Sequence, residues 1–446
     1  MNATHPGGQS LAGGPPPLSL VDPLTGLLPT VIVGEMDPAD PDVFVCATDT
    51  VELEVYGSPY PVSGKGSGAG LTYEAALGAA VGEGIERYAF SVVHPEDLVV
   101  GSHAELTASG RQAVGPERWA LFEEAQYRAL GLTRFETTTK LAWIVAESVT
   151  HRQERLVPAC FVFVPYTRPF AAHGEETVGV GVSTGAACGR TRLEALLKGL
   201  CELVERDAFM IMWRNRLPRP RVQIDPQSSL YETFQTRFAR PGLEYVLICT
   251  TLDLAIPSFV GILLDRRPGR RGILVGGAAH PDPAVAALKT LLELVQGLKW
   301  KDYHRSTFEY EPGFANVRTF EDRACLYATT DLEEATAFLL EGSHQVALSS
   351  IPSLDQGDSR LTYRHCVELL GKQGLEVLAV DVTPVDVSDC GLHVVRTLIP
   401  GCEIMEGDHR APLLGGWRWR DVPKRLGLAV GCQTAEGVNP YPHPYP

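Results

Sequence analysis

Two copies of the pattern Glu-x-x-Glu-Arg are the residues of this chain best suited to chemistry. The first copy contains Glu83 and Glu86, and the second contains Glu202 and Glu205. On a helix, residues three apart are neighbours, so each pair projects from one face. The flanking residues are mostly apolar, and buried like charges are costly unless a cation neutralises them. Mg²⁺ suits such oxygen ligands. The alternative is that each glutamate pairs with a nearby arginine or lysine on a solvated face.

The two patterns belong to an internal repeat. Residues 63–90 align with residues 182–209 at a constant separation of 119 positions, without a gap across 25 residues. Both copies predict a Gly-rich turn followed by a helix. A weaker third copy lies at residues 293–296, Glu-Leu-Val-Gln. Because repeated units pack on one another, we expect a pseudo-symmetric architecture whose equivalent helices face a shared cleft.

Three cations could bind phosphate near these helices. Lys65 lies in the first Gly-rich turn, Arg190 lies at the end of the second, and Arg396 follows a strand-like run before a Pro-Gly turn. Helix N-termini attract phosphates. The order of a P-loop is absent, so any nucleotide site is of another kind. Each of these residues could equally be an ordinary surface cation.

The C-terminal residues 439–446 read Asn-Pro-Tyr-Pro-His-Pro-Tyr-Pro. Alternate prolines favour an extended polyproline II form that has little entropy left to lose. The segment is therefore either a preformed strap that enters a site or a mobile terminus.

Composition limits the class of protein. The 446 residues carry a formal charge of −15, which disfavours a broad nucleic-acid surface. No signal peptide and no apolar run long enough to span a membrane are apparent, so a cytoplasmic protein that does not bind membranes is expected. The ten cysteines form no CxxC pair and are read as reduced, mostly buried thiols.

The remaining pattern predicts a mixed α/β chain. Helices are expected at 72–90, 192–213 and 284–300. Strands are expected at 43–50, 51–57, 156–165, 245–253, 258–265 and 272–279, with a solvated hairpin tip at 265–272. Residues 1–19 are expected to form a flexible lead-in, residues 20–438 one domain, and residues 439–446 a Pro-rich tail.

Together these motifs resemble the YcaO superfamily. The resemblance rests on Gly64-Lys65-Gly66, on both Glu-x-x-Glu-Arg helices, on the sequence Arg-Thr-Leu-Ile-Pro-Gly from Arg396 and on the PxPxP end. It extends from about residue 20 to the C-terminus. The tail and the sequence Leu-Val-Asp-Pro-Leu-Thr-Gly near residue 20 further resemble the branch of cyclodehydratases that forms azolines in ribosomally made peptides.

The resemblance implies an α/β pseudo-symmetric fold around a shared ATP and Mg²⁺ cleft, commonly in a dimer. The residues that match the family's functional positions are Glu83, Glu86, Glu202 and Glu205 for magnesium, Arg206 and Arg396 for the nucleotide phosphates, Glu194 for the nucleotide, and Pro442, Pro444 and Pro446 for cyclodehydration. Ala187 and Arg190 depart from the Ser and Asn of many members, so contacts to adenosine are less clearly implied. His443 or the carboxylate of Pro446 could act as a general base.

The implied reaction is ATP-dependent activation of a backbone amide in a precursor peptide. A Cys, Ser or Thr side chain attacks the preceding carbonyl, and the oxygen leaves as phosphate, which gives a thiazoline or (methyl)oxazoline. Capture of the activated amide by sulfide, an amine or water would instead give a thioamide, an amidine or cleavage, and a non-catalytic scaffold is a further alternative. An E1-like partner would supply peptide recognition, and a flavin-dependent dehydrogenase could follow.

Overall fold

The computed structural model describes residues 18–52, 64–119, 121–179, 181–303, 307–330, 332–342, 344–428 and 434–445. Most of the predicted lead-in, most of the strand expected at 51–57, and Pro446 lie outside the described residues.

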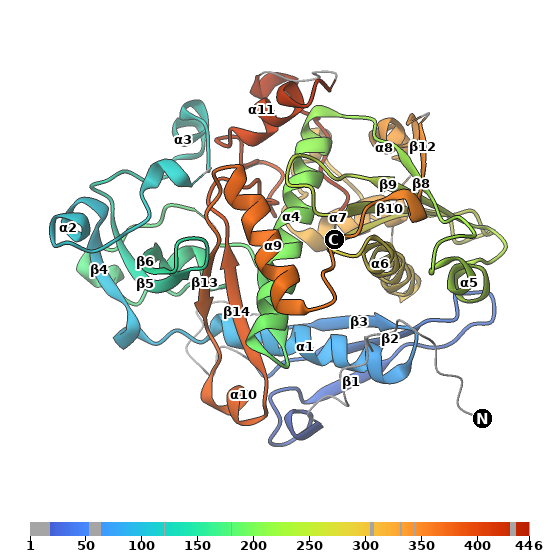
Figure 1. Ribbon diagram of the computed structural model, residues 1–446, viewed down its shortest axis with the longest axis horizontal. Helices are drawn as coiled ribbons and strands as arrows, with labels where there is room; N and C mark the ends of the chain where they lie inside the picture. Colours follow the sequence, from blue (N-terminus) through green and yellow to red (C-terminus); the bar gives the residue numbers. More distant parts are fainter. Residues whose placement is uncertain are drawn as a thin grey trace.

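Three β-sheets form the framework (Figure 1). The first sheet is antiparallel, and in it β3 pairs with β2 from Gly66 opposite Thr48 to Gly70 opposite Phe44. Its strands are β1 (Thr30–Val33), β2 (Phe44–Asp49) and β3 (Gly66–Gly70). The second sheet has the order β11 (Gly272–Ala279), β10 (Ser258–Asp265), β9 (Leu243–Cys249), β8 (Arg221–Gln223) and β12 (Gln345–Ala347). The third has the order β4 (Val99–Ser102), β5 (Lys140–Ser148), β13 (Leu378–Asp381), β14 (His393–Leu398) and β7 (Ala186–Gly189), and β6 (Gln153–Pro158) pairs with β5.

Four long helices pack against these sheets: α1 (Tyr73–Ser91), α4 (Arg192–Asn215), α6 (Pro283–Tyr303) and α9 (Ser359–Lys372). The shorter helices are α2 (His103–Ala108), α3 (Glu124–Leu130), α5 (Tyr231–Thr233), α7 (Phe320–Thr329), α8 (Glu333–Leu340), α10 (Val385–Asp389) and α11 (Arg418–Arg425). Helix α4 crosses the middle of the molecule beside α9 (Figure 1). This central position makes α4 the element that joins the sheets.

Three strand–helix units close into a ring, and this arrangement confirms the expected pseudo-symmetry. Each unit is a strand followed by a long helix: β3 with α1, β7 with α4, and β11 with α6. Each helix packs on its own strand and also on the strand of another unit, so that α1 contacts β7, α4 contacts β11, and α6 contacts β3. The weak third copy in the sequence is therefore a true structural equivalent of the other two.

The local sequence explains how these units form. Thr72 and Thr191 cap α1 and α4, and each side-chain oxygen accepts a backbone N–H of the first turn. Gly68 lets β3 lie against α1, because a Cβ atom there would come within 2.5 Å of Ala80 N and the Ala79 Cβ. The small residues on this helix face thus permit a close strand–helix approach.

The element predictions hold for the three helices and for the strands at 43–50, 258–265 and 272–279. The strand expected at 245–253 is present but ends at Cys249. Two further predictions were wrong in detail. The run 156–165 is strand only up to Pro158, after which a 3₁₀ turn begins at Ala159. Residues 66–70 form strand β3 rather than a turn, because their glycines face the small residues of α1.

The hairpin between β10 and β11 is present, but its tip is not fully solvated. Arg267 is buried, and its guanidinium pairs with Asp40 and Asp265. Lys301 of α6 also reaches Asp265, at 2.7 Å. Arginines of the sequence Asp-Arg-Arg-Pro-Gly-Arg-Arg-Gly therefore bind the N-terminal segment to the second sheet.

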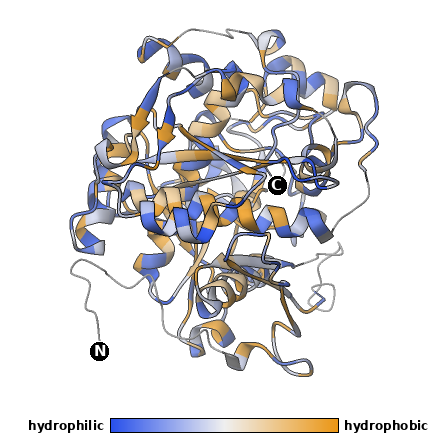
Figure 2. Ribbon diagram, turned by 90° about the vertical axis from the view of Figure 1, so that its right-hand side faces the viewer, coloured by the Kyte–Doolittle hydropathy of each residue, from blue (hydrophilic) through white to orange (hydrophobic). Residues whose placement is uncertain are grey.

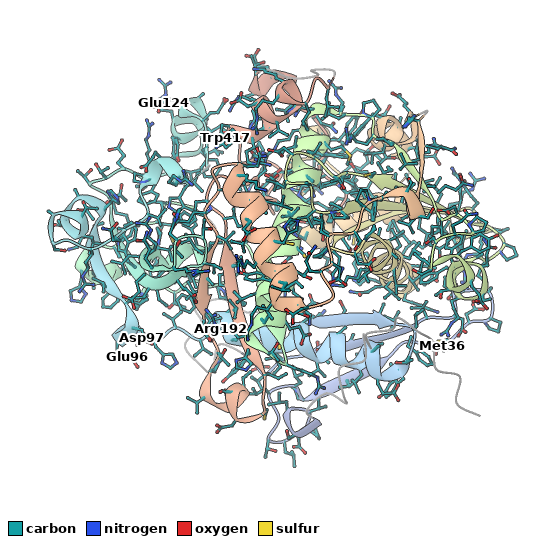
Figure 3. All side chains as sticks on the ribbon, viewed as in Figure 1. Met36, Glu96, Asp97, Glu124, Arg192 and Trp417 are labelled. Carbon is teal, nitrogen blue, oxygen red and sulfur yellow. The ribbon has the colours of Figure 1, made fainter. Side chains whose placement is uncertain are left out.

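Hydrophobic residues concentrate in the strands and on the inner helix faces, whereas polar residues gather on outer faces (Figure 2). The labelled acidic residues Glu96, Asp97 and Glu124 lie at the periphery (Figure 3). Of the helices in the described part of the chain, none has both the length and the apolar character needed to cross a membrane.

Candidate active site

The first glutamate of each repeated helix binds the backbone of its own strand. Glu83 accepts a hydrogen bond from Ser67 N at 2.8 Å, Glu202 from Gly185 N at 2.9 Å, and Glu293 from Gly277 N at 2.8 Å. The same contact occurs once in each unit. The ring therefore places one carboxylate at the same position of every strand–helix unit.

The residue three positions later points to another unit. Glu86 accepts a hydrogen bond from Cys188 N of β7 at 2.7 Å. Gln296 donates to the Ser67 hydroxyl beside β3, at 2.5 Å. Glu205 lies close enough to Glu293 and to Tyr445 beside β11 for both to shift its pKa. These side chains thus connect the three units around their common centre.

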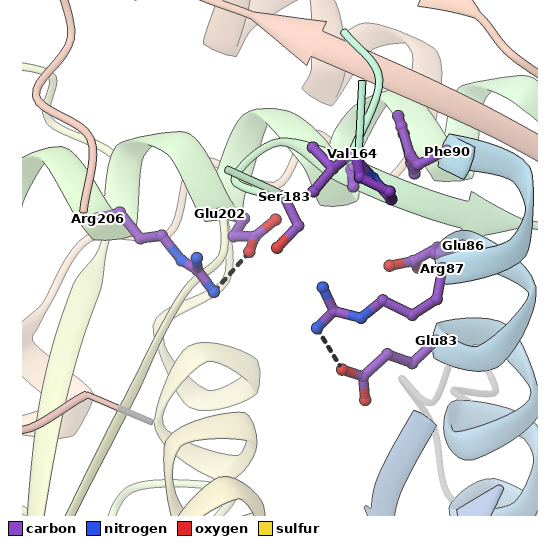
Figure 4. A pocket seen from close by; sticks show the side chains of 10 residues that line it. Glu83, Glu86, Arg87, Phe90, Val164, Ser183, Glu202 and Arg206 are labelled. Carbon is purple, nitrogen blue, oxygen red and sulfur yellow. Dashed lines mark hydrogen bonds and ion pairs between the residues drawn. The ribbon is translucent and has the colours of Figure 1, made fainter. Parts of the chain in front are cut away.

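A pocket of about 480 Å³ opens where α1 and α4 face each other. Its wall includes Glu83, Glu86, Arg87, Glu202 and Arg206. Two ion pairs face one another across it, Arg87 with Glu83 at 3.0 Å and Arg206 with Glu202 at 2.7 Å (Figure 4). The two Glu-x-x-Glu-Arg copies therefore meet in one cleft, as the repeat predicted.

The carboxylates at this centre hold protons more tightly than usual. Burial is the main cause that raises the pKa of Glu86 to about 8, and the charges of Glu83 and Glu202 add to it. Burial likewise raises the pKa of Glu293 to about 7. For Glu205, burial and the neighbouring Glu293 raise the pKa well above its ordinary value. A divalent cation would relieve this crowding of acidic groups.

Two arginines flank the carboxylates, Arg206 partly buried and Arg396 buried. Arg206 donates to Thr184 Oγ1 at 3.0 Å, and Arg396 donates to Phe161 O at 3.2 Å. Burial tends to lower the pKa of Arg206, but Glu202 and Glu205 raise it on balance. Burial lowers the pKa of Arg396 to about 10. Both side chains remain cationic at neutral pH and suit an anion.

Two of these arginine nitrogens have no hydrogen-bond acceptor among the described residues. They are Nε of Arg206 and Nη1 of Arg396, and both are buried. Buried donors are normally satisfied, so an orphan is a specific feature that needs an explanation. An oxygen-rich ligand would supply the acceptors. The donor set therefore fits phosphate oxygens as well as the carboxylates fit Mg²⁺.

Four predicted nucleotide residues lie away from the wall of this pocket, namely Lys65, Arg190, Glu194 and Arg396, and the predicted metal ligand Glu205 is not on it either. Lys65 and Arg190 are exposed, at the starts of β3 and α4. Glu194 accepts the backbone N–H of Arg190 at 3.0 Å and pairs with Lys198 at 2.7 Å. Although burial opposes it, Lys198 helps to lower the pKa of Glu194. The structure thus places Arg190 and Glu194 at the N-terminal end of α4, the Glu202–Arg206 group further along the same helix, and Lys65 before β3.

The C-terminal tail is buried, which favours the strap over the mobile terminus. The tail residues Pro442, His443, Pro444 and Tyr445 are all buried. Tyr327 donates to Pro442 O at 2.7 Å, and the ring of Tyr445 lies 4.3 Å from that of Phe209. A Cβ atom on Gly277 would collide with the Tyr445 hydroxyl, so β11 needs glycine at this position. The tail therefore reaches the centre of the ring.

His443 lies in the core rather than in the pocket. Its Nε2 is 3.1 Å from Glu406 O, and its ring packs on Phe209 and Phe320. Burial, together with the nearby cation Arg323, lowers the pKa of His443 well below its ordinary value. A neutral, enclosed imidazole is suited to fix the tail in place, and this placement disfavours its use as a general base.

Sequence reasoning missed three polar residues of the third unit. Glu293 and Gln296 occupy the positions equivalent to Glu202 and Glu205, and the weak third copy was the signal that could have identified them. Lys289 lies one turn earlier on α6. Its burial and the charge of Lys198 lower its pKa. These residues link α6 to the carboxylates of the other two units, although none of them is among the residues that line the pocket.

The described residues contain no group of three or more His, Cys, Asp or Glu side chains close enough to hold a metal ion. Instead, Glu83 and Glu202 are paired with arginines. Mg²⁺ commonly binds through one or two carboxylates together with substrate phosphates, so it does not require a preformed cage. The residues present fit such a shared site.

A buried ionic network holds the far end of α4. Arg418 donates to Asp207 at 2.7 Å and to Asp253 at 2.8 Å. Arg214 binds Glu403 and Glu406, and Glu403 accepts the backbone N–H of Trp419. Because Asp207 directly follows Arg206, this network fixes the helix that carries the second Glu-x-x-Glu-Arg copy.

A protein-family comparison matches residues 67–403, which include every helix of the site. The matching family is described as the YcaO cyclodehydratases, which bind ATP and Mg²⁺. This chain belongs to the YcaO family. ATP and Mg²⁺ are the cofactors of that family, in agreement with the expectation from the residues.

Two curated relatives are uncharacterized proteins. One, from Methanothermobacter thermautotrophicus, is 26% identical over 372 residues, which cover 81% of this chain and 88% of the relative. The other, from Rhizobium leguminosarum bv. trifolii, is described as a protein in the tfuA 3′ region. It is 28% identical over 270 residues, which cover 54% of this chain and 58% of that protein.

Solved structures share the YcaO fold. A heterocyclase in complex with substrate and cofactor matches with a TM-score of 0.78 and 25% identity, over 98% of this chain and 58% of that chain. The heterocyclase TruD matches with a TM-score of 0.65 and 26% identity, over 84% of this chain and 51% of the TruD chain. YcaO from Methanopyrus kandleri, bound with AMPPCP and Mg²⁺, matches with a TM-score of 0.60 and 20% identity, over 84% and 86%. The chain thus spans little more than half of each heterocyclase.

Proposed function

We propose that this chain uses ATP to activate backbone amides of a ribosomally made precursor peptide, and that it cyclodehydrates Cys, Ser or Thr residues to thiazolines or (methyl)oxazolines. The observation that carries the proposal is the pocket between α1 and α4, where Glu83, Glu86 and Glu202 lie beside Arg206, whose Nε lacks an acceptor among the described residues. Arg396 lies on the wall of a second cavity, and α6 is joined to the first unit through the hydrogen bond from Gln296 to Ser67. Family membership supplies the reaction class, and the two heterocyclases support ring formation.

In this reaction the substrate side chain attacks the preceding carbonyl carbon. The oxygen of the resulting adduct takes the γ-phosphoryl group of ATP, and ADP leaves. Loss of phosphate and a proton then closes the C=N bond of the azoline. An amide oxygen is a poor leaving group, and phosphorylation removes this obstacle. The task of the protein is therefore positioning and neutralisation of charge.

We assign the metal to Glu83, Glu86, Glu202 and Glu205, with Glu293 and Gln296 of α6 added to the set. Mg²⁺ would supply charge neutralisation between the phosphate oxygens. Arg206 and Arg396 would bind phosphate oxygens through the nitrogens that lack an acceptor in the described structure. Lys65, Arg190, Glu194 and Lys289 would hold the rest of the nucleotide at the N-terminal side of α4.

We assign the tail a positioning role. Pro442, Pro444 and the buried His443 hold the strap against α4 and α7, and Tyr445 reaches Glu205. Pro446 lies outside the described residues, and we propose it as a further contact with the reacting amide. A chain that ends at Val438 should lose ring formation, whereas an enzyme that forms thioamides should tolerate the deletion.

We also propose partners for this chain. An E1-like protein would recognise the leader of the precursor peptide, a flavin-dependent dehydrogenase would oxidise the azoline, and the chain would act as a homodimer. The cytoplasm is the expected location. Size-exclusion chromatography with light scattering would test the dimer, and co-purification would test the E1-like partner.

The deciding experiment measures phosphate release and peptide mass together. The full-length chain is incubated with ATP, Mg²⁺, the partner and a Cys-, Ser- and Thr-containing precursor peptide. Loss of one water per modified residue, coupled to phosphate release, would support the proposal. Replacement of oxygen by sulfur would indicate thioamide formation. Absence of ATP use with every peptide would favour a non-catalytic scaffold.

A further inference from the structure

A second, smaller cavity of about 50 Å³ lies beside Arg396. Its wall is largely apolar and includes Leu203, Leu398 and Ile404. Two stacked aromatic rings complete it, Trp119 and Phe161, whose centroids are 4.5 Å apart. The cavity has room for about three or four water-sized groups, so it suits a small apolar group rather than a nucleobase.

The small cavity and the main pocket share a wall. Ser183 lines the main pocket, and the next residue, Thr184, lines the small cavity. Arg396 lies at this junction, because it lines the small cavity and its guanidinium is 5.6 Å from the ring of Phe90 in the main pocket. A group in the small cavity would therefore lie next to the arginine that we assign to the phosphates.

Two buried donors on the wall lack an acceptor among the described residues. They are the indole nitrogen of Trp119 and Nη1 of Arg396, which is only 3% exposed as a residue. Because Nη1 of Arg396 is the nitrogen that we assign to phosphate, the Trp119 indole is the donor left for a second ligand. A buried N–H group without an acceptor is costly, and the site would be satisfied by a ligand that brings oxygen atoms. A peptide offers a carbonyl at every residue and apolar side chains between them. An apolar cavity with the unsatisfied Trp119 indole on its wall is complementary to such a ligand.

We propose that this cavity binds the side chain of the substrate residue that precedes the cyclised Cys, Ser or Thr, and that it selects a small apolar side chain there. The Trp119 indole donates to a backbone carbonyl of the same peptide, and Arg396 separates the peptide from the nucleotide. This inference rests on the proposed function, since it places the activated amide at the junction of the two cavities.

Binding of short peptides tests the inference without turnover. Fluorescein-labelled peptides Gly-Gly-X-Cys-Gly-Gly, with Ala, Val, Leu or Phe at X, are titrated with the full chain in AMPPCP and Mg²⁺, and anisotropy is followed. We expect Ala and Val to bind at least about tenfold more tightly than Phe, since shape exclusion in an apolar pocket has effects of this size.

Two variants and one matched control locate the effect. Ile404→Ala enlarges the cavity and should reduce the preference for Ala over Phe to less than about threefold. Trp119→Phe keeps the ring stack but removes the N–H group, and should weaken all four peptides about fivefold. Leu369→Ala, in the same hydrophobic cluster as Ile404 but away from the cavity, should change neither quantity. Circular dichroism confirms that each variant is folded.

The outcomes separate the inference from the reaction. The inference is overturned if the unmodified chain shows no preference at X, or if Ile404→Ala and Trp119→Phe behave as Leu369→Ala does. The same peptides, incubated with ATP and analysed by mass, test the reaction independently. Size selection without ring formation would keep the peptide site and reject the proposed function. Ring formation without size selection would keep the proposed function and reject the peptide site.

Discussion

The two Glu-x-x-Glu-Arg copies have the same residues but different surroundings. In the first, the side chains of Arg87 and Glu83 are 38% and 30% exposed, whereas those of Arg206 and Glu202 are 19% and 25% exposed. The second copy lies on α4, which is held by the buried ion pair between Arg418 and Asp207. In the first copy, Glu86 on α1 accepts a hydrogen bond from a backbone N–H group of β7. The comparison teaches that the repeat sets the strand–helix unit and that contacts distant in the sequence set its role.

The largest difference should appear in stability. Arg418→Ala leaves Asp207 and Asp253 buried without their shared cation, and should lower the free energy of unfolding by about 3–5 kcal/mol. Arg87→Ala removes a half-exposed pair and should cost at most about 1 kcal/mol. Urea unfolding of both variants checks this. Equal losses would mean that α4 is not held more firmly than α1.

Loss of a carboxylate from the second copy or from the third copy should lower ATP turnover by a similar factor. Glu205→Gln and Glu293→Gln each remove one carboxylate from the centre, and should lower ATP turnover by about 10²- to 10³-fold without loss of fold. Glu368→Gln on the exposed face of α9 is the matched control. Normal turnover in Glu205→Gln would refute the metal assignment, and normal turnover in Glu293→Gln alone would remove α6 from the site.

The raised pKa values predict a dependence of metal binding on pH. Mg²⁺ must displace a proton from Glu86, whose pKa is about 8, and from Glu293, whose pKa is about 7. The apparent affinity should therefore rise as pH increases through 7 to 8, by up to about tenfold per unit for each proton displaced. Isothermal titration at several pH values measures this. An affinity that does not change with pH would contradict the burial of these carboxyl groups.

The raised pKa of Glu86 also predicts how the stability of the metal-free chain depends on pH. The folded chain keeps this group protonated up to pH about 8, whereas the unfolded chain ionises it near the ordinary glutamate pKa of 4.5. The folded state therefore binds more protons in this range, and its stability should fall as pH rises from 4.5 to 8. Glu86→Gln should flatten that fall in urea unfolding with a chelator present. If Glu86→Gln and the unmodified chain show the same dependence of stability on pH, the raised pKa of Glu86 is contradicted.

The smallest effect should come from the tail's hydroxyl group. Tyr445→Phe keeps the ring against Phe209 and removes only the oxygen beside Glu205 and Gly277. We expect ATP turnover to fall about 2- to 10-fold, in line with the loss of one hydrogen-bonding group. Tyr441→Phe, whose hydroxyl binds Glu334 outside the site, is the control. A loss as large as that of Glu205→Gln would give the tail a more direct role.

Much of the fold followed from local patterns. The Gly-rich turns and the apolar residues around each Glu-x-x-Glu-Arg copy predicted α1 and α4, and the constant separation of the two copies predicted their shared cleft. The same patterns could not predict which backbone each glutamate would meet, because the ring that brings Gln296 to Ser67 depends on contacts more than 200 residues apart. The proline spacing suggested a strap, but only packing against Phe209 and Tyr327 shows that it is buried.

The central claim is that three equivalent helices share one nucleotide and metal site. Crystals grown with AMPPCP and Mn²⁺, with the metal located by its anomalous signal, test it most directly. The account predicts metal in the pocket beside Glu86 and Glu205, with phosphate oxygens on Arg206 and Arg396 and with Glu293 or Gln296 of α6 in contact. Metal and phosphate bound elsewhere, or held by α1 and α4 without α6, would contradict it.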